Sequence, residues 1–189
     1  MSIILPALNQ VRRKSRVILG MNNQKQIVYS VNLFASDNDQ SYPESVATIG
    51  DSDYWNWQEP MMLTGYRARS PRLHRSMSGY LFDYIKDPDI LFCPNAPKQY
   101  KYLKQSWNAG DDWDNPESAP VKDRVSGTYC FYWNYTGYLK DKNGIFQGPR
   151  NAAGGKYQST LLVSDYFGYN HWRSRNSYSS CEIFEKTSI

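Results

Sequence analysis

The chain has 189 residues, 40% of them hydrophobic and 21% charged, a composition that indicates one folded domain with a sizeable core and excludes intrinsic disorder. Its net charge of +4 is too small to predict nucleic acid as a partner. Aromatic residues reach 15%, a level that favours β-rich packing with large rings near the surface.

A single long helix is predicted at the start of the chain, over residues 4–36. Apolar residues recur there with a period near 3.6, which is the pattern of an amphipathic helix. The other face is basic in its first half, at Arg12–Arg16, and bears amides in its second half, at Asn22 and Asn23. Such a helix is about 50 Å long at 1.5 Å per residue.

The helix is expected to end where turn-forming residues accumulate after Asp37, since Pro43 disfavours helical geometry at Tyr42. An isolated helix of this length is only marginally stable in water, so its second half must pack on the chain that follows. We therefore divide one structural domain into residues 1–43, the helix and its terminating turn, and residues 44–189, an α+β region packed on it.

After residue 43 the helical period gives way to short segments broken by Gly, Pro, Asn and Asp. A polar, acidic segment at residues 107–123 is predicted to be a loop, and Asn143-Gly144 favours a tight turn. The predicted elements are one short helix and three strands, at residues 76–85, 90–93, 128–135 and 161–164.

The three cysteines give no recognisable metal or redox motif. Cys93, Cys130 and Cys181 are an odd count without a CxxC pair, which excludes zinc-ribbon and thioredoxin-type sites. An exported chain can form one disulfide among them, and the spacing does not select the pair.

Catalytic motifs are absent as well. His74 and His171 are the two histidines, and neither begins a zinc-binding spacing such as HxxxH. Ser164, Asp165 and His171 contain the residue types of a hydrolase triad, but the G-x-S-x-G context of such a serine is missing. We expect no catalysis, and we interpret Asp165 as the cap of a turn.

Two aromatic groups suggest an alternative function. Residues 129–138 and 166–172 are rich in Tyr, Phe and Trp, including Trp133 and Trp172. Alternation along a strand would place about half of the first group in the core and half at the surface. An exposed set would suit either a carbohydrate-binding platform or contacts between subunits. A secreted carbohydrate-binding module, tethered by the helix, is therefore the alternative reading.

The first 43 residues contain four short motifs: Ile4-Leu5-Pro6-Ala7-Leu8, Asn22-Asn23-Gln24-Lys25-Gln26, Phe34-Ala35-Ser36-Asp37-Asn38-Asp39 and Tyr42-Pro43. In this order they resemble the region that follows the membrane segment of bacterial prepilin-type proteins. They are similar to the pseudopilins of type II secretion systems, especially the large paralogous sets of planctomycete and Lentisphaerae-like bacteria. A Cys-Pro segment at residues 90–94 resembles a recurrent strand of the same proteins.

The resemblance implies a pilin-like α+β fold in which the long helix packs on a small antiparallel sheet with irregular loops. It implies a structural subunit of a pseudopilus or related filament, with other pilin-like subunits as partners. A leader and an apolar half-helix ending near Pro6 would precede this sequence and anchor the precursor in the inner membrane. The domain would lie in the periplasm of the bacterial envelope or in an extracellular filament.

The same resemblance assigns two faces to the helix. One face would contact neighbouring subunits and the other would contact the sheet of the same chain. Basic residues near Arg12 would lie at the membrane surface before extraction, where anionic headgroups favour them. The first face consists of Leu8, Val11, Ile18 and Met21, and the second of Val28, Val31 and Phe34.

A calcium site is a further expectation that the resemblance supports. Asp111, Asp112 and Asp114 bring several hard oxygen ligands together, which is the ligand chemistry of calcium. Some pseudopilins hold calcium in a loop of the C-terminal domain. The spacing is not that of an EF-hand, so a solvated acidic loop is the favoured interpretation and calcium the second.

Overall fold

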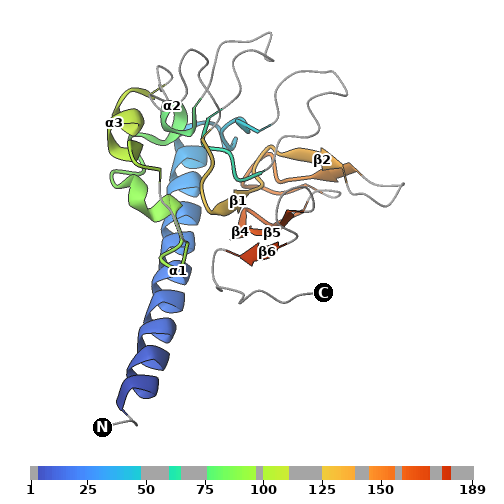
Figure 1. The fold of residues 1–189 in the computed structure, drawn as a ribbon. Helices are drawn as coiled ribbons and strands as arrows, with labels where there is room; N and C mark the ends of the chain where they lie inside the picture. The colour runs from blue at the N-terminus through green and yellow to red at the C-terminus, as the bar shows by residue number, and fades with distance from the viewer. Residues whose placement is uncertain are drawn as a thin grey trace.

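One long helix lies against a small α+β domain, which Figure 1 shows with the N-terminal end of the helix extending beyond the rest. The computed structural model describes residues 4–47, 60–64, 76–96, 100–110, 125–138, 145–155, 159–170 and 176–179. These residues form a long helix, short helical segments and two-stranded antiparallel sheets. The architecture is α+β, as predicted.

The predicted long helix is confirmed. Helix α1 spans Ile4–Asp37, 34 residues. It ends in a turn in which the backbone N–H groups of Asn38 and Gln40 donate to the Ala35 carbonyl, at 3.2 and 2.8 Å. Asp39 and Gln40 then adopt positive φ angles of 50° and 62°, a conformation that Asp tolerates better than most residues and that turns the chain out of the helix.

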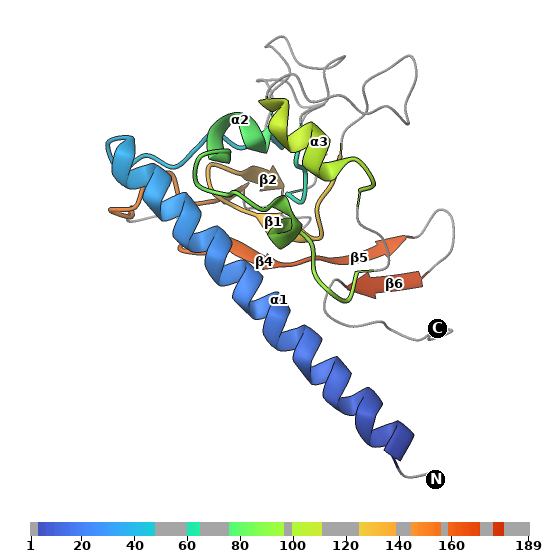
Figure 2. The same cartoon turned by 90° about the vertical axis from the view of Figure 1, so that its left-hand side faces the viewer.

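The helix packs on less sheet than the sequence suggested. Its most extensive contacts are with the short 3-10 helix η3 (Pro88–Leu91), strand β4 (Val163–Asp165) and helix α2 (Met77–Leu81). Figure 2 shows α1 crossing these elements with its second half only. The partners of α1 are therefore short helical segments as much as strands.

The segments that follow correct the predicted boundaries. Helix α2 begins after Ser76, whose hydroxyl accepts from the Gly79 N–H at 3.2 Å, and ends at Leu81 instead of residue 85. The strand predicted at residues 90–93 is wrong. Asp87 caps the N–H of Asp89 at 3.2 Å and Pro88 occupies the first helical position, so this apolar run enters the 3-10 helix η3.

The predicted loop at residues 107–123 is wrong at its start. Helix α3 spans Leu103–Asn108 and includes Trp107. The indole of Trp107 is buried and donates from Nε1 to the Ile85 carbonyl at 3.1 Å. A buried Trp needs such an acceptor, and the carbonyl at the end of the α2 region supplies it. Residues 111–124 lie outside the described part of the chain.

The described strands form separate two-stranded antiparallel sheets. Strand β1 (Tyr129–Phe131) pairs with β4, with Cys130 opposite Ser164. Strand β2 (Thr136–Tyr138) pairs with β3 (Ile145–Gln147), and the turn predicted at Asn143-Gly144 lies outside the described residues. The strand predicted over residues 128–135 is interrupted at Asn134, which has a φ of 50°. Strands β5 (Phe167–Asn170) and β6 (Asn176–Ser179) form a third antiparallel pair.

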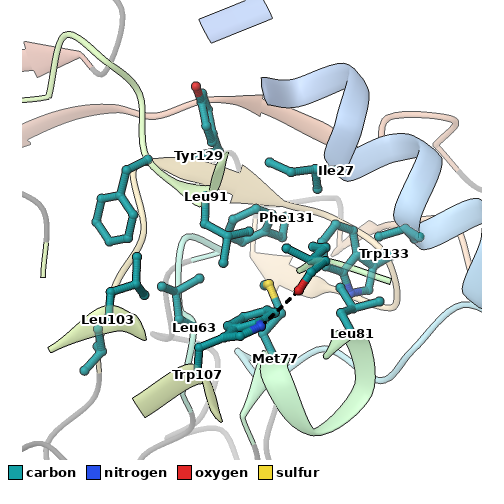
Figure 3. Packing of buried hydrophobic residues seen from close by; sticks show 14 of the residues in the cluster. Ile27, Leu63, Met77, Leu81, Leu91, Leu103, Trp107, Tyr129, Phe131 and Trp133 are labelled. Atoms are coloured by element: carbon teal, nitrogen blue, oxygen red, sulfur yellow. Dashed lines mark hydrogen bonds between the residues drawn. The ribbon is translucent and has the colours of Figure 1, made fainter. Parts of the chain in front are cut away.

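The core lies between the second half of α1 and the short elements that it crosses. Figure 3 shows the side chains of Trp107 and Met77 packing below Leu91 and Phe131, with Ile27 contributed by α1. Complete burial of each such aliphatic side chain contributes about 1.5–3 kcal/mol. The core therefore forms only when the second half of α1 packs against these elements.

Candidate functional site

The first half of α1 has few contacts with the domain. Residues 6–19, which we call the projecting half, are exposed at every position except Val17, which is half-buried. Large apolar side chains are included: Val11 is 63% exposed and Ile18 is 60% exposed. Leu8, Leu19 and Met21 are exposed as well. The residues predicted to form an assembly face thus all lie at the surface.

The second half of α1, residues 20–37, is held tightly, and we call it the docked half. Ile27 and Val31 are completely buried. Of the residues predicted to face the sheet, Val28 and Phe34 are half-buried. The Phe34 ring packs edge-on against Tyr84, with ring centroids 5.6 Å apart, and therefore contacts the α2 region.

Polar groups fasten the docked half at intervals. The Tyr129 hydroxyl donates to the Gly20 carbonyl at 3.3 Å, where the projecting half ends. Asn23 Nδ2 donates to the Phe92 carbonyl at 3.2 Å, and the Ser30 hydroxyl donates to the Tyr84 carbonyl at 3.0 Å. Asn23 and Ser30 are buried. The sequence reading placed Asn23 on the polar face, which is wrong, because its amide satisfies a backbone carbonyl of the domain.

The outer face of the docked half, which points away from the domain, carries two exposed apolar residues. Tyr29 is 68% exposed and Leu33 is 58% exposed. Sequence reasoning did not single them out, although their exposure on a helix whose core face is already filled marks them as available for contacts. Their spacing of four residues puts them on one side of the helix.

The acidic end of α1 follows this outer face. The Tyr84 hydroxyl donates to Asp37 Oδ2 at 3.0 Å. This hydrogen bond is the main cause that raises the pKa of Tyr84, followed by desolvation and by the negative charges of Asp37 and Asp83. Two carboxylates therefore act on the same phenol, and one of them, Asp83, is also paired with Lys86 at 3.3 Å.

Asn134 clamps the chain that leaves α1. Its Nδ2 group donates to the carbonyls of Tyr42 and Pro43, both at 2.9 Å. The Tyr42 hydroxyl in turn donates to Asn32 Oδ1 at 3.0 Å, which ties this segment back to the helix. Asn134-Tyr135-Thr136 matches a glycosylation sequon in sequence, but the amide nitrogen is engaged in this clamp.

The structure does not test the candidate calcium ligands or the two histidines. Asp111, Asp112, Asp114, His74 and His171 lie outside the described residues. Within the ranges that the structure describes, no group of three or more His, Cys, Asp or Glu side chains is arranged to hold a metal ion.

Ser164 and Asp165, which the sequence analysis considered as triad residue types and set aside, form hydrogen bonds to other groups. The Ser164 hydroxyl donates to the Asp165 carbonyl at 3.1 Å. Asp165 lies in strand β4 and accepts from Gln24 Nε2 at 2.9 Å, so it connects β4 to α1. The prediction that Asp165 caps a turn is wrong.

The disulfide prediction is only partly covered by the structure. Cys93 and Cys130 are buried thiols, so the structure does not join these two residues. Cys181 lies outside the described part.

The buried aromatic rings do not form a binding platform. Every residue of β1 is buried, so the expected alternation of its side chains between core and surface is wrong. Trp133 is 2% exposed and belongs to the core. Tyr132, Tyr135 and Phe146 form a half-buried cluster with ring centroids 5.2–6.3 Å apart. Trp172 is outside the described residues.

A small apolar cavity lies beside Trp133 and Met62. Its volume is about 10 Å³, which is at the lower limit for one water molecule. Small-molecule sites in proteins are typically about 300–1,000 Å³. This cavity is a packing defect and not a ligand site.

Among the described residues, no helix combines the length and the apolar character that crossing a membrane requires. No model of a protein family, no curated protein and no solved structure matches this chain. The surface of α1 is therefore the candidate functional site, on the evidence of its own geometry.

Proposed function

We propose that this chain is a structural subunit of a pseudopilus or pilin-like filament of the bacterial envelope, without catalytic activity. Its assembly element is the projecting half of α1, and its partners are copies of itself or related pilin-like subunits. The observation that carries the proposal is the sharp division of one continuous helix into a docked half and a projecting half.

The physical argument concerns the cost of the projecting half. A helix of fewer than about 15 residues is marginal in water unless it is packed. Residues 6–19 continue α1 with only Val17 half-buried, and they expose Leu8, Val11, Ile18 and Leu19. Contact with another helix would bury these side chains and stabilise the projecting half.

The proposal includes a location. A precursor anchored in the inner membrane would hold the domain in the periplasm, and the assembled filament would remain in the envelope or leave the cell. Basic side chains between Arg12 and Arg16 would lie near anionic headgroups while the precursor is anchored.

The alternative function, carbohydrate binding, cannot use Trp133, since a buried indole cannot stack on a sugar.

Sedimentation velocity and electron microscopy over a range of concentrations test the proposal. The chain is expected to associate and to form rods or filaments at high concentration. The double variant Val11→Asp, Ile18→Asp should remain monomeric with an unchanged melting temperature, because both side chains are exposed.

Leu161→Asp supplies the matched control, because it replaces an exposed apolar side chain by a charge outside α1. It should still assemble. A parent chain that stays monomeric at its highest soluble concentration would contradict the proposed function.

A further inference from the structure

The charges of this chain are distributed unevenly between α1 and the rest. Residues 1–36 contain five basic residues and no acidic residue, which leaves 17 of the 22 basic and all 18 acidic residues for the remainder. Four of the five lie within Arg12–Arg16, in the projecting half. A positive cluster on an exposed helix attracts a negative surface and repels its own equivalent in another copy.

Negative charge lies at the opposite end of the same helix. Asp37 is its last residue, Asp39 follows in the terminating turn, and the last turn of α1 contains no basic residue. A carboxylate at a helix C-terminus opposes the helix dipole. Asp37 accepts one hydrogen bond within the chain, from the Tyr84 hydroxyl at 3.0 Å, but both Asp37 and Asp39 are exposed, so their charge is accessible to a cationic surface of a second copy.

We propose that the projecting half of one copy lies along the outer face of the docked half of the next copy, with the two helices parallel. The helices are displaced along their axis by about 21–25 residues, or about 32–38 Å. Arg16 lies opposite Asp37 at a displacement of about 21 residues, and Arg12 does so at about 25 residues. The inference rests on the proposed function, and it specifies the contact through which that function is performed.

Two of the exposed apolar residues, Leu8 and Val11, fit the same displacement, whereas Ile18 and Leu19 would lie beyond the C-terminal end of the neighbouring α1. A shift of about 21–25 residues places Leu8 opposite residues 29–33 and Val11 opposite residues 32–36. Tyr29 and Leu33, the exposed apolar residues of the outer face, occupy that stretch. One displacement of the two helices therefore brings basic residues opposite Asp37 and Leu8 opposite the stretch that contains Tyr29 and Leu33.

The direction of the two helices decides what the contact builds. In the parallel arrangement each copy still presents its own projecting half, so the contact is heterologous and propagates into a filament. An antiparallel arrangement can also bring Arg12–Arg16 opposite Asp37, but it forms a closed dimer. It would place Ile18, and not Leu8, opposite Leu33.

Cysteine cross-linking between two separately prepared variants distinguishes these arrangements. Leu8→Cys is mixed with Leu33→Cys, each in a Cys181→Ser background, under mild oxidation. We expect a disulfide-linked dimer from this mixture and little from Ile18→Cys mixed with Leu33→Cys. The background chain without an added cysteine measures any contribution of the buried Cys93 and Cys130 thiols.

Charge reversal in the same assay tests the ion pairs. Asp37→Lys in the Leu33→Cys partner should lower the cross-linking yield by roughly five-fold, the scale expected for exposed charge pairs. Arg12→Asp with Arg16→Asp in the Leu8→Cys partner should restore it. Tyr84→Phe removes the hydrogen bond to Asp37 but keeps its charge, so this control should leave the yield unchanged.

Three outcomes overturn the inference. Stronger cross-linking of Ile18→Cys than of Leu8→Cys to Leu33→Cys shows the antiparallel dimer and leaves self-association intact. Binding to phosphatidylglycerol vesicles that depends on Arg12 and Arg16, without cross-linking between copies, assigns the cations to a membrane surface. A chain that remains monomeric in sedimentation overturns the proposed function together with this contact.

Discussion

The two halves of α1 belong to one helix but differ in their surroundings, because one half packs on the domain and the other is exposed. The docked half is specified by burial: Ile27 and Val31 fill the core, and Asn23 satisfies a carbonyl of the domain. The projecting half, residues 6–19, has no such constraint, and yet it retains large apolar side chains. The comparison teaches that burial specifies only one half of this helix, and that the exposed apolar groups of the other half form the surface on which the proposed assembly depends.

The sharpest way to break this comparison is to place the same charge in each half. Val31→Asp buries a carboxylate without a partner and should unfold the domain, at a cost of about 4–5 kcal/mol or more. Val11→Asp should change the free energy of unfolding by less than about 0.5 kcal/mol. Urea denaturation measures both. Val28→Asp, at a half-buried position, should lie between them, and equal losses at Val31 and Val11 would refute the division.

A close backbone contact between Gly148 and Tyr132 gives the next largest effect. A Cβ atom on Gly148 would overlap the carbonyl of Tyr132, which belongs to the backbone and cannot move aside as a side chain can. Gly148→Ala should therefore destabilise the domain by about 3 kcal/mol. Gly154→Ala is the contrasting variant, because a Cβ there meets nothing within 4 Å and its cost comes from the positive φ alone. A thermal unfolding series that ranks Gly154→Ala as the worse variant would contradict the described packing.

The Asn134 clamp predicts a smaller and separable loss. Asn134→Ala removes two hydrogen bonds to the chain that leaves α1 and places Ala at a φ of 50°. We expect a loss of about 2–3 kcal/mol. Asn134→Gly removes the same hydrogen bonds but tolerates the positive φ, so it should recover part of that loss. Equal melting temperatures for the two variants would show that backbone conformation has no role here.

The smallest effect concerns the Tyr84 hydroxyl at the acidic end of α1. Its pKa is raised in the folded state, first by the hydrogen bond to Asp37. A raised pKa means that its contribution to stability is complete below pH 10.0, the unfolded value, and is lost as the pH rises through the folded value. Tyr84→Phe should therefore flatten the alkaline end of the stability profile and leave neutral pH almost unchanged. An alkaline profile identical to that of the parent chain would contradict this assignment.

The sequence was sufficient for the long helix because periodic apolar residues, turn formers after Asp37 and Pro43 all indicate the same element. It was insufficient at Ile90–Cys93, where an apolar run resembles a strand until the cap at Asp87 and Pro88 is seen to start a 3-10 helix. The burial of Asn23 could not be predicted either, because a polar side chain is buried only where it finds a hydrogen-bond partner. Here that partner is the Phe92 carbonyl, which is distant in sequence.

For the candidate site, the apolar pattern indicated which residues belong to α1. It did not indicate the position along α1 at which packing on the domain begins. That limit is set at Gly20 by Tyr129, which is about 109 positions away in sequence. Tyr29 and Leu33 were overlooked for the same reason, since their exposure depends on which face the distant elements cover. The assembly role of Leu8, Val11, Ile18 and Met21 stays a prediction.

Amide hydrogen exchange along α1, measured at low and high protein concentration, tests the central claim most directly. In dilute solution residues 23–35 should be strongly protected and residues 6–19 should exchange rapidly, as an unpacked helix does. At high concentration the projecting half should gain protection while the docked half stays unchanged. Equal protection of the two halves in dilute solution, or a projecting half that exchanges at the same rate at every concentration, would contradict the account.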